Sequence, residues 1–271
     1  MFLKGKSITT FLNKSLSTAS VKTDFKNGIK EIIMCNSKAR NTLSIEMMEN
    51  LIHNIKHDQD NSNLRVIVIS GEGPVFSAGH NLKELSNNKE KQIECFNLAS
   101  DLMRTIIDAP VPIIAKVNGI AAAAGCQLAA QCDLVICSSH SQFSTPGANV
   151  GIFCSTPGVA LARSINKLPA LYMLLTGLPI SAEEAYRTGL VTKVCPPEKL
   201  DEEVTVICKA ILNKSRDVIE LGKKFYYKQV QYETKKAYDL AGEKMIENLQ
   251  LPDCKEGIQS FIEKRKPQWS K

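Results

Sequence analysis

The chain has 271 residues, enough for one large domain or for one domain with a smaller appendage. Its formal net charge is +6, and four of these charges lie in the first 23 residues, on Lys4, Lys6, Lys14 and Lys22. The remaining balance of about +2 is too weak to favour nucleic acid or an anionic membrane as a partner, and no apolar run of about 18 residues predicts a membrane span.

Residues 1–23 are basic, rich in Ser and Thr and free of Asp and Glu, with scattered apolar side chains. This composition is typical of an amphipathic mitochondrial transit peptide, and the alternative is a disordered basic tail. We therefore expect the protein in the mitochondrial matrix.

Nine cysteines are scattered along the chain without any CxxC pair, and there are only four histidines. Disulfide frameworks and structural zinc sites need tighter spacing. We expect reduced, buried thiols that behave as small apolar residues, and no metal site.

The first predicted elements alternate between strand and helix. A β-branched run at Ile29–Cys35 predicts a strand, and Ser44 is placed to cap a helix with one apolar stripe of Met48, Leu51, Ile52 and Ile55. Leu64–Ser70 is almost continuously apolar, as expected of a strand covered on both faces, and Gly and Pro at 71–74 end it.

The same alternation continues along the chain. A helix is expected over Lys89–Ile107, a strand over Pro112–Val117, a short helix from Ala124 and a strand over Asp133–Cys137. Strands that alternate with helices in this way predict parallel strands joined by helical crossovers.

Helical patterns dominate the end of the chain. Ser181 and Glu184 form a capping box for a helix that ends at Gly189, and amphipathic helices follow from about residue 200. We predict three parts: a transit segment at 1–23, an α/β core at 24–199 and a helical C-terminal region at 200–271, whose apolar stripes serve either the core or contacts between subunits.

Four segments carry a recognisable pattern: VFSAGHNLKEL at 75–85, NG at 118–119 through AGCQLA at 124–129 to CD at 132–133, QFSTP at 142–146 through PG at 157–158, and GIQSFIEKRKP at 257–267. In this order and spacing they resemble the motifs of the crotonase (enoyl-CoA hydratase/isomerase) family over roughly residues 24–269. The resemblance implies an α/β spiral of ββα units, a CoA thioester as ligand without a further cofactor, and a homotrimer or homohexamer.

The resemblance also implies an oxyanion hole for the enolate that forms from a thioester in this family. Carried over by position, its two donors are the backbone N–H groups of His80 and Ala124, which no substitution other than proline removes. Small residues at 121–125 would let the backbone approach the thioester closely. The alternative is that these Ala and Gly residues only permit tight packing of a strand against a helix.

Further positions match the family's CoA-binding segments. They are Lys38, Ala39 and Arg40, and a second stretch of Ala78, His80, Asn81, Leu82 and Lys83. Lys83 would face a phosphate or would be an ordinary solvated lysine.

The family's acid/base residues are missing. Hydration uses two carboxyl groups, and the two glutamate positions hold Gln127 and Gly147, while the aspartate position of some relatives holds Ser155. None of these can exchange a proton near neutral pH, so efficient hydration is not expected. The missing side chain at Gly147 should also make room in the pocket.

The interpretation favoured by these departures is a mitochondrial acyl-CoA-binding protein of fatty-acid metabolism that lacks hydratase activity. The alternative is an active lyase that relies on enolate stabilisation, either a hydratase or a decarboxylase of malonyl-type thioesters in which the His80 side chain takes part. Nucleophilic catalysis by Cys154 or Ser155, and a purely structural role without CoA, are further options.

Overall fold

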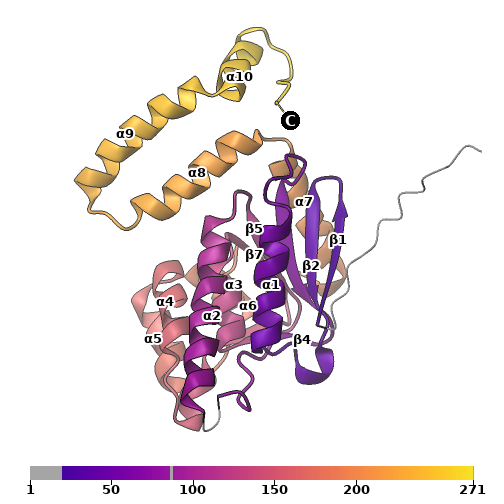
Figure 1. The fold of residues 1–271 in the computed structure, drawn as a ribbon, viewed down its shortest axis with the longest axis vertical. Coiled ribbons are helices and arrows are strands. Elements are labelled where there is room, and N and C mark those ends of the chain that lie inside the picture. The colour runs from indigo at the N-terminus through magenta and orange to yellow at the C-terminus, as the bar shows by residue number, and fades with distance from the viewer. Residues whose placement is uncertain (1–19, 86–87, 271) are drawn as a thin grey trace, which may run out of the picture.

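The computed structural model describes residues 20–85 and 88–270 (Figure 1). Most of the predicted transit segment, residues 1–19, lies outside the described residues. The predicted boundary at residue 23 is wrong, because it falls inside strand β1 (Val21–Lys26), whose Val21 is fully buried in the core. The folded part of the chain therefore includes residues 20–23.

Ten strands form two sheets in the described residues. The larger sheet has the order β1-β2-β3-β5-β7-β10 and the smaller one the order β4-β6-β8-β9. Only β1 and β9 run antiparallel to their neighbours. The strands after β1 are β2 (Ile29–Met34), β3 (Val66–Gly71), β4 (Val75–Ser77), β5 (Ile113–Val117), β6 (Ile120–Ala122), β7 (Leu134–Ser138), β8 (Gln142–Ser144), β9 (Ile180–Ser181) and β10 (Lys193–Cys195).

Helices connect these strands in the predicted order: β3 and β4 precede α2, β5 and β6 precede α3, and β7 and β8 precede α4. Each ββα unit thus gives one strand to each sheet, and the predicted crotonase spiral is confirmed. The α-helices are α1 (Ile45–His57), α2 (Lys89–Asp108), α3 (Ala124–Gln131), α4 (Ser155–Ser164), α5 (Lys167–Thr176), α6 (Ala182–Thr188), α7 (Leu200–Leu212), α8 (Arg216–Gln229), α9 (Thr234–Gln250) and α10 (Pro252–Ile262). Short 3-10 turns lie at Ser37–Ala39, Pro146–Val150 and Pro197–Lys199.

The larger sheet is covered on both faces, which explains the continuous apolar run of β3. Ile67 and Ile69 belong to the main core cluster with α1 and α2, whereas Val66 and Val68 pack in a second cluster with Leu200 and Val204 of α7. Helix α7 is therefore part of the α/β core. The predicted domain boundary at residue 200 is too early, and the separate helical region begins with α8.

Local capping follows the sequence closely. The Ser44 hydroxyl accepts a hydrogen bond from the Met47 N–H at 3.2 Å, and Glu84 accepts one from the Ile45 N–H at 3.0 Å, so the loop after β4 is tied to the start of α1. The predicted capping box of Ser181 and Glu184 is present, and α6 ends at Gly189 with φ of 89°.

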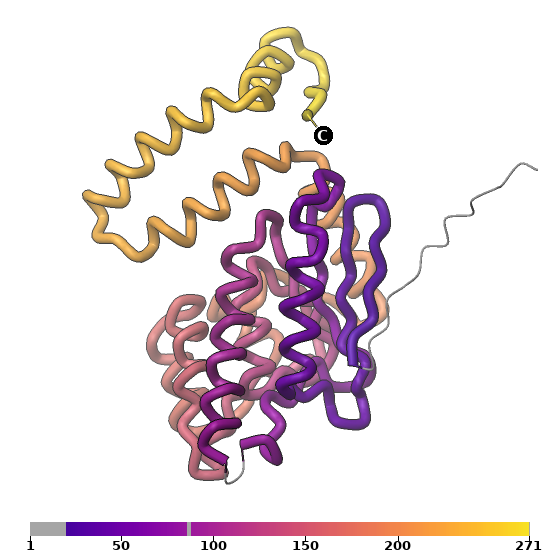
Figure 2. The backbone as a smooth tube through the Cα atoms, viewed as in Figure 1, coloured from indigo at the N-terminus to yellow at the C-terminus, as the bar shows by residue number. Residues whose placement is uncertain are grey.

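Helices α8–α10 project from the body as an arm, which the tube in Figure 2 shows in orange and yellow. The arm is anchored by Lys223 of α8, whose side chain is 6% exposed. Its ammonium donates to Asp133 at 2.7 Å and to the carbonyl oxygens of Ile106 and Val111 at 2.9 and 3.0 Å. Asp133 also accepts from the Tyr227 hydroxyl at 2.9 Å, so α8 is bonded to the loops beside β5 and β7.

Replacing Lys223 by Met should lower the free energy of unfolding by about 3–5 kcal/mol, because it leaves the Asp133 carboxylate buried without its cation. The neighbouring Lys224 is a matched control: its side chain is 56% exposed and pairs with Glu220. Lys224→Met should cost less than about 1 kcal/mol. Urea unfolding of both variants tests the anchor, and equal costs would contradict it.

The described residues contain no helix long and apolar enough to cross a membrane and no group of three or more His, Cys, Asp or Glu side chains arranged to hold a metal ion. All nine cysteines are free thiols, and seven are buried.

Candidate active site

Two loops meet where the smaller sheet ends. Strand β4 pairs in parallel with β6, so Ala78–His80 after β4 and Ala123–Ala124 after β6 leave the same edge of the sheet. The approach is as close as backbone permits: a Cβ added to Gly79 would lie 2.8 Å from the Ala123 Cβ and 3.0 Å from the Ala124 nitrogen. The structure therefore brings together the two segments whose N–H groups the sequence assigns to an oxyanion hole.

Both N–H groups are available to a ligand. Among the backbone hydrogen bonds outside helices and strands in residues 20–85 and 88–270, none is donated by His80 or Ala124. The N–H of the preceding residue, Ala123, by contrast donates to the Ser144 carbonyl oxygen at 2.9 Å. Ala124 is the first residue of α3, where intrahelical acceptors are lacking and the helix dipole is positive. No acidic side chain lies in this first turn.

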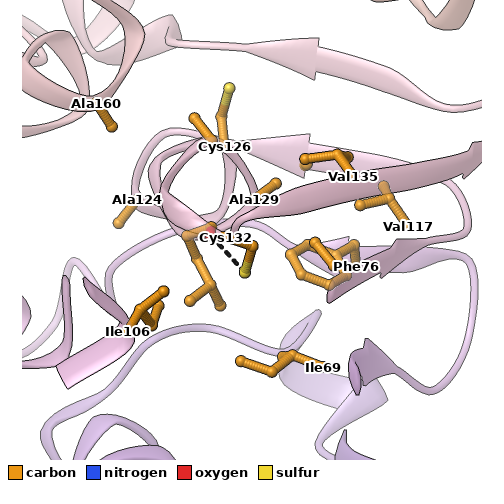
Figure 3. Packing of buried hydrophobic residues seen from close by; sticks show 14 of the residues in the cluster. Ile69, Phe76, Ile106, Val117, Ala124, Cys126, Ala129, Cys132, Val135 and Ala160 are labelled. Atoms are coloured by element: carbon orange, nitrogen blue, oxygen red, sulfur yellow. Dashed lines mark hydrogen bonds between the residues drawn. The ribbon is translucent and has the colours of Figure 1, made fainter. Parts of the chain in front are cut away.

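The turn into α3 is strained. Ala123 has φ of 50° and ψ of −120°, a conformation that costs a residue with a side chain on the order of 1–3 kcal/mol. Gly125 follows, and a Cβ there would lie 2.3 Å from the Ser77 carbonyl oxygen, so α3 sits directly on β4. Figure 3 shows the small side chains of α3, including Ala124 and Ala129, packed among Phe76, Ile69 and Ile106.

A predominantly apolar cavity of about 800 Å³ opens beside these N–H groups. Of the predicted site residues, it is lined by Ala78, His80, Asn81, Leu82, Lys83, Ala124 and Gly147. Lys38, Ala39, Arg40 and Gln127 do not line it.

The segment at 38–40 nevertheless lies next to the cavity loop. The Ala78 N–H donates to the Arg40 carbonyl oxygen at 3.0 Å, and the Leu43 N–H donates to Gly79 at 2.8 Å. Lys38, Ala39 and Arg40 are exposed, so their side chains face solvent beside the loop that carries His80.

The imidazole of His80 packs beneath α2. Its Nδ1 lies 3.3 Å from the Leu43 carbonyl oxygen and 3.6 Å from the Cys95 sulfur, and the tautomer with its proton on Nδ1 donates to Leu43. Its Nε2 is buried without a partner among the described residues, and Phe96 contacts the ring edge to face at 5.4 Å. Burial lowers the pKa of His80, which keeps the ring neutral at pH 7.

Gln127 occupies a buried position on α3. It is 5% exposed, and its Oε1 has no hydrogen-bond partner among the described residues. A glutamine amide here can accept a hydrogen bond from a donor but cannot take up its proton near neutral pH.

The second position, Gly147, does not make room as expected. A Cβ at Gly147 would lie 2.3 Å from the Ile152 carbonyl oxygen and 2.7 Å from the Cys154 sulfur, and the Ile152 N–H donates to Gly147 at 2.9 Å. The chain at 147–154 is folded back onto the place where a side chain would begin. The expectation of extra space is wrong, because the loop has closed over it.

The nucleophilic option gains no support. Burial raises the pKa of the Cys154 thiol, which disfavours the thiolate. Ser155 is exposed, and its hydroxyl donates to the Phe153 carbonyl oxygen at 3.4 Å.

The sequence did not reveal the apolar side chains of the cavity, among them Phe96, Val150, Ile152 and Phe153. Phe96 is part of the amphipathic pattern of α2, where a cavity residue and a core residue follow the same spacing. The grouping of Val150, Ile152 and Phe153 in the loop before α4 was the available signal.

Gly147→Ala should destabilise the protein by about 1–3 kcal/mol, because the added methyl overlaps the Ile152 backbone. Gly158 in α4 is a matched control, since a Cβ there would meet only Leu174 side-chain atoms at 3.4 and 3.6 Å. Gly158→Ala should be neutral or stabilising by up to about 1 kcal/mol. Thermal unfolding compares them, and a neutral Gly147→Ala would contradict the closed loop.

Comparison with known proteins shows the family of the chain. Residues 24–271 match the family model described as enoyl-CoA hydratase/isomerase. The chain therefore belongs to the enoyl-CoA hydratase/isomerase, or crotonase, family, which confirms the prediction from its motifs.

Within the family the chain is similar to enoyl-CoA hydratase domain-containing protein 3, mitochondrial. It is 51% identical to the Homo sapiens protein over 246 residues, covering 90% of this chain and 81% of that one. It is 50% identical to the Rattus norvegicus protein over 247 residues, covering 90% and 82%. The crystal structure of the human protein superposes with a TM-score of 0.91 at 49% identity, covering 92% of this chain and 100% of that chain.

The predicted localisation is confirmed at the level of the organelle. The relatives from several species carry the word mitochondrial in their names, and this protein is mitochondrial.

Proposed function

We propose that this protein binds an acyl-CoA thioester in the mitochondrial matrix, polarises its carbonyl group, and takes part in fatty-acid metabolism without hydrating the thioester efficiently. The observation that carries the proposal is the pair of unused N–H groups of His80 and Ala124 at the edge of an apolar cavity. Such donors stabilise the negative charge that develops on a thioester oxygen.

Slow hydration follows from the absence of acid/base side chains at positions 127 and 147. One positioned acid or base typically contributes a factor of about 10²–10⁴ to a rate, and Gln127 and Gly147 supply neither group. The loop at 147–154 brings Ile152 and Phe153 to the cavity instead of a carboxylate. An apolar wall at this place disfavours the water molecule that hydration requires.

The alternative is an active lyase that uses enolate stabilisation alone. Its donors would be the same N–H pair, and loss of carbon dioxide from a malonyl-type thioester needs no general base. A side-chain role for His80 in that reaction is weakly supported, because its Nε2 is shielded from solvent and its Nδ1 faces Leu43.

We also propose a homotrimer or homohexamer built through the arm. No residue of α8 or α9 is buried, and the arm exposes large apolar side chains, among them Tyr238, Met245, Ile246 and Phe261. Exposed apolar surface of this kind is typical of subunit contacts.

The test is mass spectrometry of the full chain after incubation with 2-enoyl, 3-enoyl, malonyl-type and saturated acyl thioesters. The proposal predicts that thioesters are retained by the protein through gel filtration and recovered unchanged. Ala124→Pro is the matched variant: proline is tolerated at the first position of a helix and removes one N–H donor. Retention should weaken by up to about tenfold.

Two outcomes would oppose the proposal. A product heavier by one water, or lighter by one carbon dioxide, that disappears in Ala124→Pro would make the protein a lyase. Absence of any retained thioester would contradict CoA binding altogether.

A further inference from the structure

The cavity has two apolar walls that the family motifs do not account for. One is Phe96 of α2, and the other is formed by Val150, Ile152 and Phe153 around the folded-back loop. Phe96 touches the ring of His80, so this wall begins directly beside one oxyanion donor. An acyl chain that extends from a carbonyl held at His80 and Ala124 meets these side chains first.

These walls are not covered in the described chain. Phe96 is 37% exposed, Ile152 44%, Phe153 51% and Val150 61%. Water-exposed apolar side chains gathered around a cavity are energetically unfavourable until an apolar group covers them. Because these side chains are grouped beside the oxyanion donors, the acyl chain of the thioester is the part of the ligand that would cover them.

The charges of the residues that line the cavity also favour an apolar acyl chain. Among the described residues that line the cavity, only Lys83 carries a formal charge at neutral pH, since His80 is neutral. Lys83 lies on the loop after β4 rather than on either apolar wall. A carboxylate on the acyl group would lose its hydration against these walls without gaining a cation there.

From these observations we infer that the thioester bound here carries a medium or long, uncharged hydrocarbon chain, and that Phe153 and Phe96 determine this preference. The inference rests on the proposed function, and it excludes malonyl-type thioesters as preferred ligands. This preference follows from the loop at 147–154, which folds back at Gly147. It brings Ile152 and Phe153 to the cavity in place of an acid/base side chain.

The first test is a calorimetric series of acetyl-, butyryl-, hexanoyl- and decanoyl-CoA with the full chain. Burial of each added methylene should raise affinity two- to about fourfold, so decanoyl-CoA should bind at least about 50-fold more tightly than butyryl-CoA. Isovaleryl-CoA and malonyl-CoA form a second pair of nearly equal shape. Isovaleryl-CoA should bind at least about tenfold more tightly, because only malonyl-CoA brings a carboxylate.

The second test uses Phe153→Ser and Phe96→Ala, with Leu168→Ser as control. Leu168 is 77% exposed on α5 and is not among the lining residues. Either cavity variant should lower decanoyl-CoA affinity by about tenfold and leave acetyl-CoA affinity within about twofold, whereas Leu168→Ser should change neither. The wild-type series decides the question if a cavity variant fails to fold.

Equal affinity for all chain lengths, with CoA binding retained, would overturn this inference and leave the proposed function standing. So would equal binding of malonyl-CoA and isovaleryl-CoA. If Phe153→Ser dissociates an oligomer without changing the dependence on chain length, these side chains belong to a subunit interface and the inference is wrong. If no thioester binds, the proposed function itself fails.

Discussion

The close approach of the loop after β4 to the start of α3 is the constraint on which the rest of the site depends. Two backbone N–H groups can act on one oxygen only if the chains that carry them lie almost in contact. Gly79 and Gly125 permit that contact, since a Cβ at either would overlap its neighbours, and the parallel pairing of β4 with β6 sets its direction. The strained Ala123 completes the turn at a cost of on the order of 1–3 kcal/mol.

A site made of backbone donors and a site made of side chains respond differently to substitution. The N–H groups of His80 and Ala124 persist whatever side chains surround them, provided that the fold holds. Acid/base side chains have no such protection, and the two positions that correspond to them by motif hold Gln127 and Gly147. At Gly147 the change is also structural, because Ile152 and Cys154 occupy the space in which a longer side chain would begin. Under the proposed function, the protein polarises a thioester without moving a proton.

Much of the fold could be predicted from the sequence because local rules decide it. Helix α2 begins at Lys89 and α3 at Ala124 as expected, and the caps of Ser44 and Ser181 form as their spacing predicts. The start of the domain was misplaced because β1 is an edge strand in which only Val21 is buried, so its sequence resembles a polar tail. The amphipathic pattern of α7 likewise predicts an apolar face, but it does not indicate whether that face packs on a sheet or on another subunit.

The candidate site, like the fold, could be predicted from the sequence only in part. Motif spacing predicted that the loop after β4 and the start of α3 carry the oxyanion donors, and the structure brings these two segments together. The motif spacing did not reveal the closed loop at Gly147 or the two apolar walls that contain Phe96 and Phe153. These features depend on where a loop folds in space. The sequence therefore predicted which acid/base groups the site lacks, and the structure adds which side chains line the cavity.

The most direct test of the central claim is the infrared carbonyl stretch of an acyl-CoA labelled with carbon-13 at the thioester carbonyl, measured free and bound to the protein. Two hydrogen bonds from His80 and Ala124 should move the stretch to lower frequency, and Ala124→Pro should reverse most of that shift. A bound thioester with the frequency of the free one would contradict the account, because the two N–H groups would then not act on the carbonyl.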